Sequence, residues 1–236
     1  MKLKIMMTSA FVLLVLVGCA DQPKEQDASI PVAEETSFET IPETLQDGNL
    51  TIEYPQLSPV QDGAVEQQIN EVIKEDVSLF MNDYKDPDAS LNMDYKIMLQ
   101  NDEILSIVYT GDYSFTGGMY PSHFLFTTNI DMKTGEKIKL TDRFVIDEAF
   151  IDSFKQSPYI DREENQSNYM EKKAAVTEYV FRQDLLEAFK NADQPSFVKN
   201  LYGVYTYYTE DALIISIQVP HVLGDHAEFK LSLEGA

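Results

Sequence analysis

The sequence predicts an α+β domain with a mainly antiparallel sheet and with helices segregated to one face. Several segments alternate apolar and polar side chains, as strands do, and other segments between them carry apolar residues at helical spacing. The chain has 236 residues, of which 44% are hydrophobic, and this is enough for a substantial core. We place a single folded domain at residues 49–236, after a signal peptide at 1–18 and an acidic disordered tether at 19–48.

The first half of the domain is predicted to contain one helix and five strands. Ser58 is a preferred N-cap residue and Pro59 suits the first helical position, so the helix begins there and ends near Met81. Its apolar stripe consists of Val65, Ile69, Val72, Ile73, Val77 and Phe80. The strands are predicted at residues 50–54, 93–99, 103–113, 123–131 and 137–140. The strand at 103–113 is apolar on both faces, which places it centrally in the sheet.

The second half is predicted to contain two helices followed by strands. A short helix is expected at 147–154, and a longer helix begins at Asn168 and carries an apolar stripe that reaches Phe189. The chain then returns to strand, with alternating apolar residues at 213–219 and 227–233. Hairpins with helices between them complete the predicted α+β class.

The charge of the chain restricts its partners. It carries 18 Lys and Arg against 40 Asp and Glu, a formal charge of −22. No basic patch is available for a phosphate backbone, so nucleic acid is not expected as a partner, and cationic or neutral partners are favoured. A single cysteine excludes a disulfide framework, and three histidines leave little room for a histidine-built metal centre. No cofactor is expected.

The N-terminus predicts export. Lys2 and Lys4 precede a short apolar run at 10–17, too short to span a membrane. The residues Leu16-Val17-Gly18-Cys19 then resemble a bacterial lipobox, in which the cysteine carries diacylglycerol. The alternative is an ordinary cleavable signal with an incidental cysteine. We expect a lipid anchor on Cys19 that holds the protein at the extracytoplasmic face of a bacterial membrane.

The histidines give the one constellation that could bind a metal. His221, Asp225 and His226 lie close together around Gly224, and His123 is a conceivable fourth member. Imidazole and carboxylate groups at close range could bind zinc. The alternative is a polar loop that enters the last strand, with Gly224 needed for the turn. The sequence otherwise lacks a nucleophile elbow, a phosphate-binding glycine loop and a zinc-protease motif.

Tyrosines give the candidate ligand surface. Their rigid rings with hydroxyl tips, beside many carboxylates, would suit a basic partner. The candidate ligand-binding residues are Tyr159, Asp161, Glu163, Glu164, Tyr205, Tyr207 and Tyr208. The alternative is that the cluster at 205–208 packs in the core, because in a strand Tyr205 and Tyr207 face one way and Tyr208 the other.

A series of short motifs supports a family resemblance. In order they are Thr110-Gly111, Gly117-Gly118-x-x-Pro121, Asn129-Ile130-Asp131, Thr134-Gly135-Glu136, Leu140-Thr141-Asp142 and Val219-Pro220-His221. Together they resemble the RsiV/PdaC-like extracellular domain over about residues 50–233. That family includes the ectodomain of a lysozyme-sensing anti-sigma factor and the accessory region of a peptidoglycan deacetylase. Where the family often has histidine before the proline, this chain has Tyr120.

The family resemblance and the predicted localisation together indicate the expected function. We expect a lipid-anchored envelope module that binds an extracellular ligand, either a basic lysozyme-like protein or the glycan of peptidoglycan, without catalysis. Because the sensor's cytoplasmic segment and the deacetylase's catalytic domain have no counterpart here, we expect neither signalling alone nor deacetylation. One alternative is an envelope hydrolase or metal-dependent enzyme that uses the four metal candidates. Another is a passive structural lipoprotein.

Overall fold

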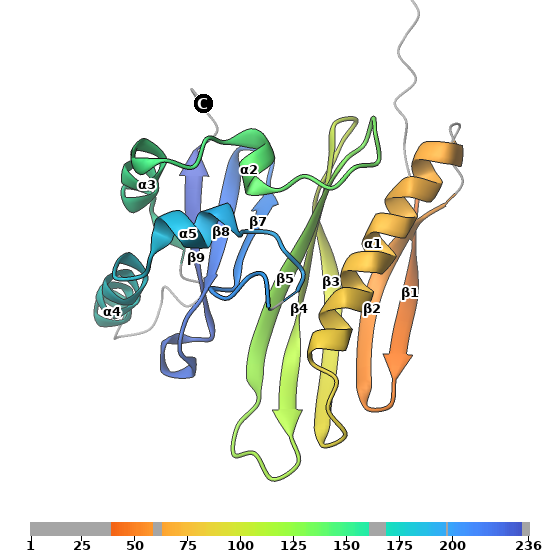
Figure 1. Cartoon of the computed structure of the whole chain (residues 1–236), viewed down its shortest axis with the longest axis horizontal. Helices are drawn as coiled ribbons and strands as arrows, with labels where there is room; N and C mark the ends of the chain where they lie inside the picture. The colour runs from red at the N-terminus through yellow and green to blue at the C-terminus, as the bar shows by residue number, and fades with distance from the viewer. Residues whose placement is uncertain (1–38, 59–62, 161–168, 197, 233–236) are drawn as a thin grey trace, which may run out of the picture. The chain divides into compact units, whose positions relative to one another are not determined.

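The computed structural model describes residues 39–58, 63–160, 169–196 and 198–232, and Figure 1 shows their arrangement. All of them belong to one compact unit that extends from residue 35 to the end of the chain. They form a five-stranded sheet that is mostly antiparallel, a four-stranded antiparallel sheet and five α-helices, so the predicted α+β class is confirmed. None of these helices is both long and apolar enough to cross a membrane.

The five-stranded sheet has its strands in chain order. They are β1 (Thr40–Asp47), β2 (Leu50–Leu57), β3 (Ala89–Gln100), β4 (Ile104–Phe115) and β5 (Ser122–Asp131). Only β2 and β3 pair in parallel, because the helix α1 (Gly63–Asp83) crosses between them. β4 lies between β3 and β5, and its first half, residues 105–109, is buried on both faces, as its apolar sequence predicts.

Helix α1 covers this sheet with the predicted apolar stripe. Ile69, Ile73, Val77 and Phe80 are buried against the strands, which explains why the helix forms with one apolar face. The ring of Phe80 stacks on that of Phe126, with centroids 4.1 Å apart. The predicted helix start at Pro59 lies outside the described residues.

The four-stranded sheet has the order β6, β9, β8, β7 and carries the remaining helices. Its strands are β6 (Tyr159–Ile160), β7 (Val204–Tyr208), β8 (Ala212–Gln218) and β9 (His226–Ser232). The helices are α2 (Leu140–Arg143), α3 (Glu148–Lys155), α4 (Tyr169–Phe181) and α5 (Leu185–Lys190), and a 3-10 turn, η1 (His221–Leu223), precedes β9. Phe154, Phe189 and Phe229 meet in the core between these helices and strands.

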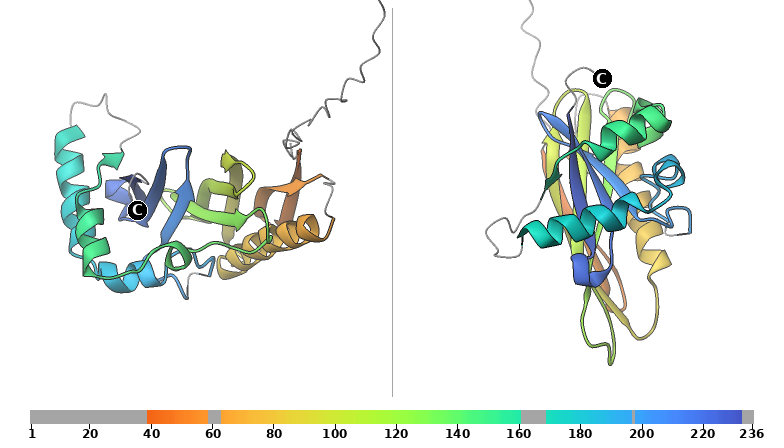
Figure 2. Two further views of the ribbon diagram at one scale, coloured as in Figure 1. Left: turned by 90° about the horizontal axis from the view of Figure 1, so that it is seen from above. Right: turned by 90° about the vertical axis from the view of Figure 1, so that its left-hand side faces the viewer.

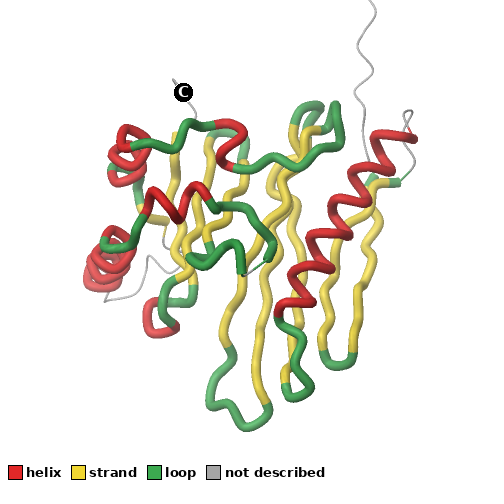
Figure 3. Tube along the Cα trace, in the orientation of Figure 1, coloured by secondary structure: helices red, strands yellow, loops and turns green. Residues whose placement is uncertain are grey.

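The helices lie largely on one side of the strands. Figure 2 shows α1 and α5 on the same side of the row of strands, with α3 and α4 at the end beside the four-stranded sheet. Figure 3, in the orientation of Figure 1, shows α1 crossing in front of strands of the five-stranded sheet. The helices are therefore segregated, as predicted, although the strands form two sheets where one was expected.

The predicted boundary between the tether and the folded domain is corrected by the structure. β1 lies within the predicted tether at 19–48, so the folded part begins about ten residues earlier than residue 49. β1 is an edge strand whose side chains are mostly exposed, so it lacks the apolar alternation that marks a strand. It is held by its pairing with β2 across the turn at Gly48, where φ is 61°.

The structure differs from the prediction in three other places. Residues 137–140 make only one bridge, from Lys137 to Ile130, and then enter α2, so they form no strand. The long helix predicted through Phe189 is two helices, because the carboxylate of Asp184 caps a new start by accepting a hydrogen bond from the N–H of Glu187. The segment between the two predicted helices, for which no element was predicted, contains the two-residue strand β6.

Candidate functional site

Asp225 lies at the turn between η1 and β9, where the backbone is left-handed. Gly224 has a φ of 108° and Asp225 has a φ of 68°, a region that glycine enters freely and that aspartate tolerates. The backbone N–H of His123, at the start of β5, donates a hydrogen bond of 3.1 Å to Oδ2 of Asp225. The same oxygen lies 3.0 Å from Nδ1 of His221. Asp225 therefore joins this turn to a strand 102 residues away in the sequence.

The four predicted metal candidates lie in one region but do not converge on one point. The imidazole of His123 pairs with Asp112 on the neighbouring strand β4. Asp225 is occupied by His221 and by the backbone of His123. Across the part of the chain that the structure describes, no three His, Cys, Asp or Glu side chains are placed to hold one metal ion. The geometry is that of a hydrogen-bonded polar turn.

The pair of Asp225 and His221 could transfer a proton, but among the described residues it lacks the other groups that a hydrolase needs. A carboxylate on one ring nitrogen orients an imidazole for proton transfer at the other, and the His221 side chain is 54% exposed. A hydrolase would also need a nucleophile, and the hydrogen bonds of the described residues give His221 no serine, threonine or cysteine partner. Its aromatic neighbour is Tyr120, whose ring stacks on it at a centroid distance of 6.1 Å.

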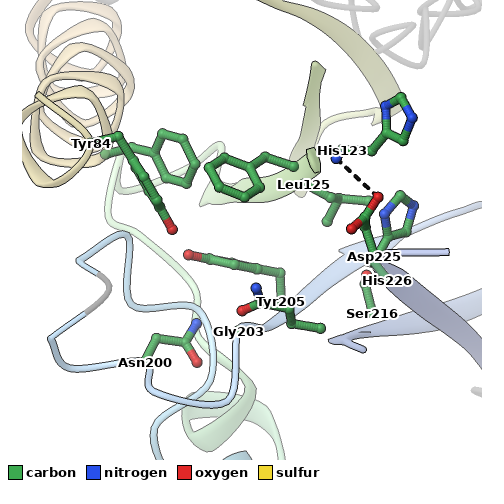
Figure 4. A pocket seen from close by; sticks show the side chains of 12 residues that line it. Tyr84, His123, Leu125, Asn200, Gly203, Tyr205, Ser216, Asp225 and His226 are labelled. Carbon is green, nitrogen blue, oxygen red and sulfur yellow. Dashed lines mark hydrogen bonds between the residues drawn. The ribbon is translucent and has the colours of Figure 1, made fainter. Parts of the chain in front are cut away.

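A narrow pocket lies beside this turn, and Figure 4 shows its walls. It has room for about 20 Å³, which is about one water molecule. The hydroxyl groups of Tyr84 and Tyr205 point toward one another across it. Burial, followed by the nearby Asp83 and Tyr113, raises the pKa of Tyr84 to about 12, and burial raises the pKa of Tyr205 further above its ordinary value. Both hydroxyls therefore stay protonated, and the pocket is too small for an organic ligand.

The predicted tyrosine surface is corrected by the structure. Tyr205, Tyr207 and Tyr208 are 6%, 4% and 5% exposed, so they pack in the core and do not form an exposed contact surface. The hydroxyl of Tyr207 donates a hydrogen bond of 2.9 Å to the buried carboxylate of Glu228. Tyr159 is also buried, and its ring packs on that of Phe229. The packing alternative therefore describes these side chains.

The remaining predicted site residues lie outside the described residues. These are Cys19 of the lipobox and the acidic candidates Asp161, Glu163 and Glu164. Their predicted roles in lipidation and in ligand binding stay predictions.

A groove that sequence reasoning missed lies between α4 and the end of β8. It encloses about 350 Å³. Its walls are Tyr179 of α4, Gln183 just after that helix, Leu201 and Tyr202 of the loop before β7, and residues 217–220. We call this the Tyr202 groove. The sequence signal for it is limited to the adjacent Leu201 and Tyr202, which form only one of its walls.

A second hollow adjoins the Tyr202 groove. Leu201 and Tyr202 line both hollows. The second hollow encloses about 500 Å³ and is also lined by Lys139, Glu187, Asn191 and Lys199. A ligand that contacts Leu201 and Tyr202 therefore borders both hollows.

Comparison with known proteins gives one family match. Residues 43–123 match the model of the family described as "Deacetylase PdaC", which confirms the PdaC-like resemblance for that segment. The segment comprises most of the five-stranded sheet and α1. The Tyr202 groove is formed by residues outside it. No curated protein matches this sequence.

Two solved structures of DUF3298 family proteins are similar to the chain. One is from Pseudomonas aeruginosa PAO1, with 15% sequence identity, a TM-score of 0.49, and coverage of 84% of this chain and 91% of that chain. The other is from Bacteroides fragilis NCTC 9343, with 15% identity, a TM-score of 0.47, and coverage of 85% of this chain and 90% of that chain.

Proposed function

We propose that this protein is a lipid-anchored module at the extracytoplasmic face of a bacterial membrane, and that it binds peptidoglycan without catalysis. The observation that carries the choice of ligand is the burial of Tyr205, Tyr207 and Tyr208, since it removes the tyrosine part of the surface predicted for a basic protein. The Tyr202 groove is lined by neutral hydrogen-bonding and apolar groups. A binding role is favoured over a catalytic one because His221 has an orienting carboxylate but no hydrogen-bonded nucleophile among the described residues.

Binding is tested with the full chain purified in detergent. The protein is mixed with isolated peptidoglycan sacculi and sedimented, and the bound fraction is measured at low and at high salt. We expect sedimentation that depends little on salt, because neutral hydrogen-bonding contacts are not screened as ion pairs are. Hen lysozyme immobilised on beads is the comparison. Retention on lysozyme without sedimentation by sacculi would show that the ligand is a basic protein and not the glycan. The attraction would then come from the net charge of −22.

The lipid anchor is tested separately. Cells that express the chain are labelled with radioactive palmitate, and the Cys19→Ser variant is the control. We expect label on the wild-type protein, release of the variant from the membrane fraction, and no label on it. An unlabelled wild-type protein would leave the ordinary cleavable signal as the explanation of the N-terminus.

A hydrolase that acts on peptidoglycan is the second candidate, and one observation favours it. Asp225 holds one ring nitrogen of the exposed His221, which is how a histidine is prepared for proton transfer. Soluble fragments released from peptidoglycan by the full chain are measured, with the His221→Ala variant as control. Release by the wild-type protein that is lost in the variant would make this candidate the function.

A further inference from the structure

The Tyr202 groove is electrically neutral in a strongly acidic protein. Its walls contain tyrosine, glutamine, proline and aliphatic side chains, and none of the described residues that line it is charged. The chain as a whole carries 40 acidic residues. A charged ligand would find no counter-charge in the groove, and its desolvation there would be uncompensated. The groove therefore suits an uncharged ligand.

The polar groups of the groove are available to a ligand. The hydroxyls of Tyr179 and Tyr202 make none of the hydrogen bonds found among the described residues, and neither does the amide of Gln218, which lines both this groove and the narrow pocket beside Asp225. Nε2 of Gln183 donates to the carbonyl oxygen of Tyr179 at 3.3 Å, which leaves its amide oxygen as an acceptor. Such hydroxyl groups and amides can both donate and accept hydrogen bonds, and this matches the hydroxyl groups of a sugar, which also do both.

The loop that carries Tyr202 is held in place before any ligand binds. The buried side chain of Asn200 donates to the carbonyl oxygen of Val204 at 2.8 Å and accepts from its N–H at 2.9 Å. The backbone N–H of Gly203 donates to the carbonyl oxygen of Asn200, and Gly203 has a φ of 54°. A side chain at Gly203 would meet Gln218, since an added Cβ would lie 2.7 Å from its Oε1. A fixed loop reduces the entropy that binding costs.

From this chemistry we infer that the Tyr202 groove binds the uncharged saccharide backbone of a glycan strand. A sugar ring has an apolar face that packs on an aromatic ring and an edge of hydroxyl and acetamido groups that bonds to amides. The volume of about 350 Å³ falls in the range of about 300–1,000 Å³ that is usual for small-molecule sites. The adjoining hollow lets a strand continue past Leu201 and Tyr202. This inference rests on the proposed function and names the part of peptidoglycan that is recognised.

The test uses a defined oligosaccharide. The pentamer of β-1,4-linked N-acetylglucosamine is titrated into the full chain in detergent, and heat release is measured by calorimetry. We expect binding that weakens at least about tenfold in Tyr202→Ala and in Gln218→Ala. The matched control is Tyr120→Ala, an exposed tyrosine outside the groove, which should bind as the wild type does. Gln218 is exposed on the strand surface, so its variant keeps the test valid if Tyr202→Ala does not fold.

A second ligand separates recognition from simple attraction. The pentamer of glucosamine lacks the acetyl groups and is cationic, so general attraction to an acidic protein would favour it. The neutral groove predicts the reverse, with tighter binding of the acetylated pentamer. Preference for the cationic pentamer, or equal affinity of the Tyr202→Ala and wild-type proteins, would overturn the inference. Sedimentation with sacculi but no binding of the acetylated pentamer would also overturn it while the proposed function stands. Failure of both assays would remove both.

Discussion

The side-chain amide of Asn129 on β5 donates a hydrogen bond of 2.7 Å to the backbone carbonyl oxygen of Thr206 on β7. The two residues belong to different sheets, and both are fully buried. Oδ1 of Asn129 accepts from the hydroxyl of Ser106 at 2.6 Å, and that hydroxyl accepts from the N–H of Tyr208 at 2.9 Å. A closed set of buried hydrogen bonds therefore joins the two sheets, and each bond depends on the others.

We predict that Asn129→Ala is strongly destabilising because it leaves the Thr206 carbonyl and the Ser106 hydroxyl without their partner. Each orphaned group costs about 1–3 kcal/mol. The free energy of unfolding, measured in urea, should therefore fall by at least about 2 kcal/mol. Asn92→Ala, an exposed asparagine on β3 of the same sheet, is the matched control and should change little. Equal stability of the two variants would show that these bonds do not hold the sheets together.

β7 is the edge strand of the four-stranded sheet, and its tyrosines contribute to both hydrophobic cores. This explains why the sequence alone did not show that all three tyrosines are buried. Alternation correctly places Tyr205 and Tyr207 on one face and Tyr208 on the other. Tyr205 and Tyr207 belong to the core of the five-stranded sheet, and Tyr208 belongs to the core of the four-stranded sheet. Period two predicts which side chains share a face, but only tertiary packing determines that both faces are covered.

In the rest of the molecule, too, features set by local periodicity were predictable from the sequence, and features set by tertiary packing were not. The stripe of α1 and the two-sided burial of β4 follow from local periodicity, and both are confirmed. β1 buries too few side chains for its sequence to show the apolar alternation of a strand. At the candidate site, the spacing of His221 and Asp225 predicts their proximity, whereas the contact with His123 depends on the fold. The Tyr202 groove joins α4 to β8, so no local signal could define it.

Gly111 marks the closest approach of two strands, and we predict that Gly111→Ala prevents stable folding. A Cβ at this position would lie 2.1 Å from the backbone carbonyl oxygen of Asn92 and 2.6 Å from Cα of Met93. Both atoms belong to the backbone of β3, which cannot move without breaking its pairing with β4. We expect the melting temperature to fall by tens of degrees, or no folded protein, in circular dichroism.

The matched control for that variant is Gly63→Ala. An added Cβ at Gly63, in the first turn of α1, meets nothing within 4 Å. Alanine also favours helix over glycine by up to about 1 kcal/mol, so this variant should be as stable as the wild type or slightly more stable. A Gly111→Ala protein with wild-type stability would show that β3 and β4 are farther apart than the structure places them.

Lys137 and Asp76 form a buried ion pair that connects α1 to the chain after β5. Nζ of Lys137 lies 2.5 Å from Oδ2 of Asp76, and the two side chains are 14% and 6% exposed. The hydroxyl of Thr128 donates to the same oxygen. We predict that Lys137→Met destabilises the fold by about 3–5 kcal/mol, because it leaves the carboxylate buried without its counter-charge.

A double variant distinguishes this cause from lost packing. Asp76→Leu with Lys137→Met removes both charges and should recover most of the stability lost in Lys137→Met, measured by urea unfolding. The exposed pair of Lys133 and Glu103 provides the control, and Lys133→Met should change stability by less than about 1 kcal/mol. No recovery in the double variant would assign the loss to packing.

Asp193 gives the stability of the protein a pH dependence opposite to that of a carboxylate whose pKa is lowered by an ion pair. Burial raises its pKa to about 6, although hydrogen bonds from Thr206 and Leu140 and the charge of Lys137 lower it. The ordinary value is 3.8, so the folded protein keeps this proton to a higher pH than the unfolded chain does. The contribution of Asp193 to stability is therefore greatest below about pH 4 and is lost as the pH rises to about 6. The loss amounts to roughly 3 kcal/mol.

Replacing Asp193 by Asn removes this titration, and the variant tests its sign. Asn places an amino group opposite the N–H of Leu140 or of Thr206, so it should be less stable than the wild type at every pH. The difference between wild type and variant should be larger at about pH 4.5 than at about pH 7.5, because only the wild type loses stability on ionisation. Asp88→Asn, an exposed residue measured in parallel, controls for the loss of one acid. A difference that grows with pH would mean that the hydrogen bonds outweigh burial and that the pKa of Asp193 is lowered.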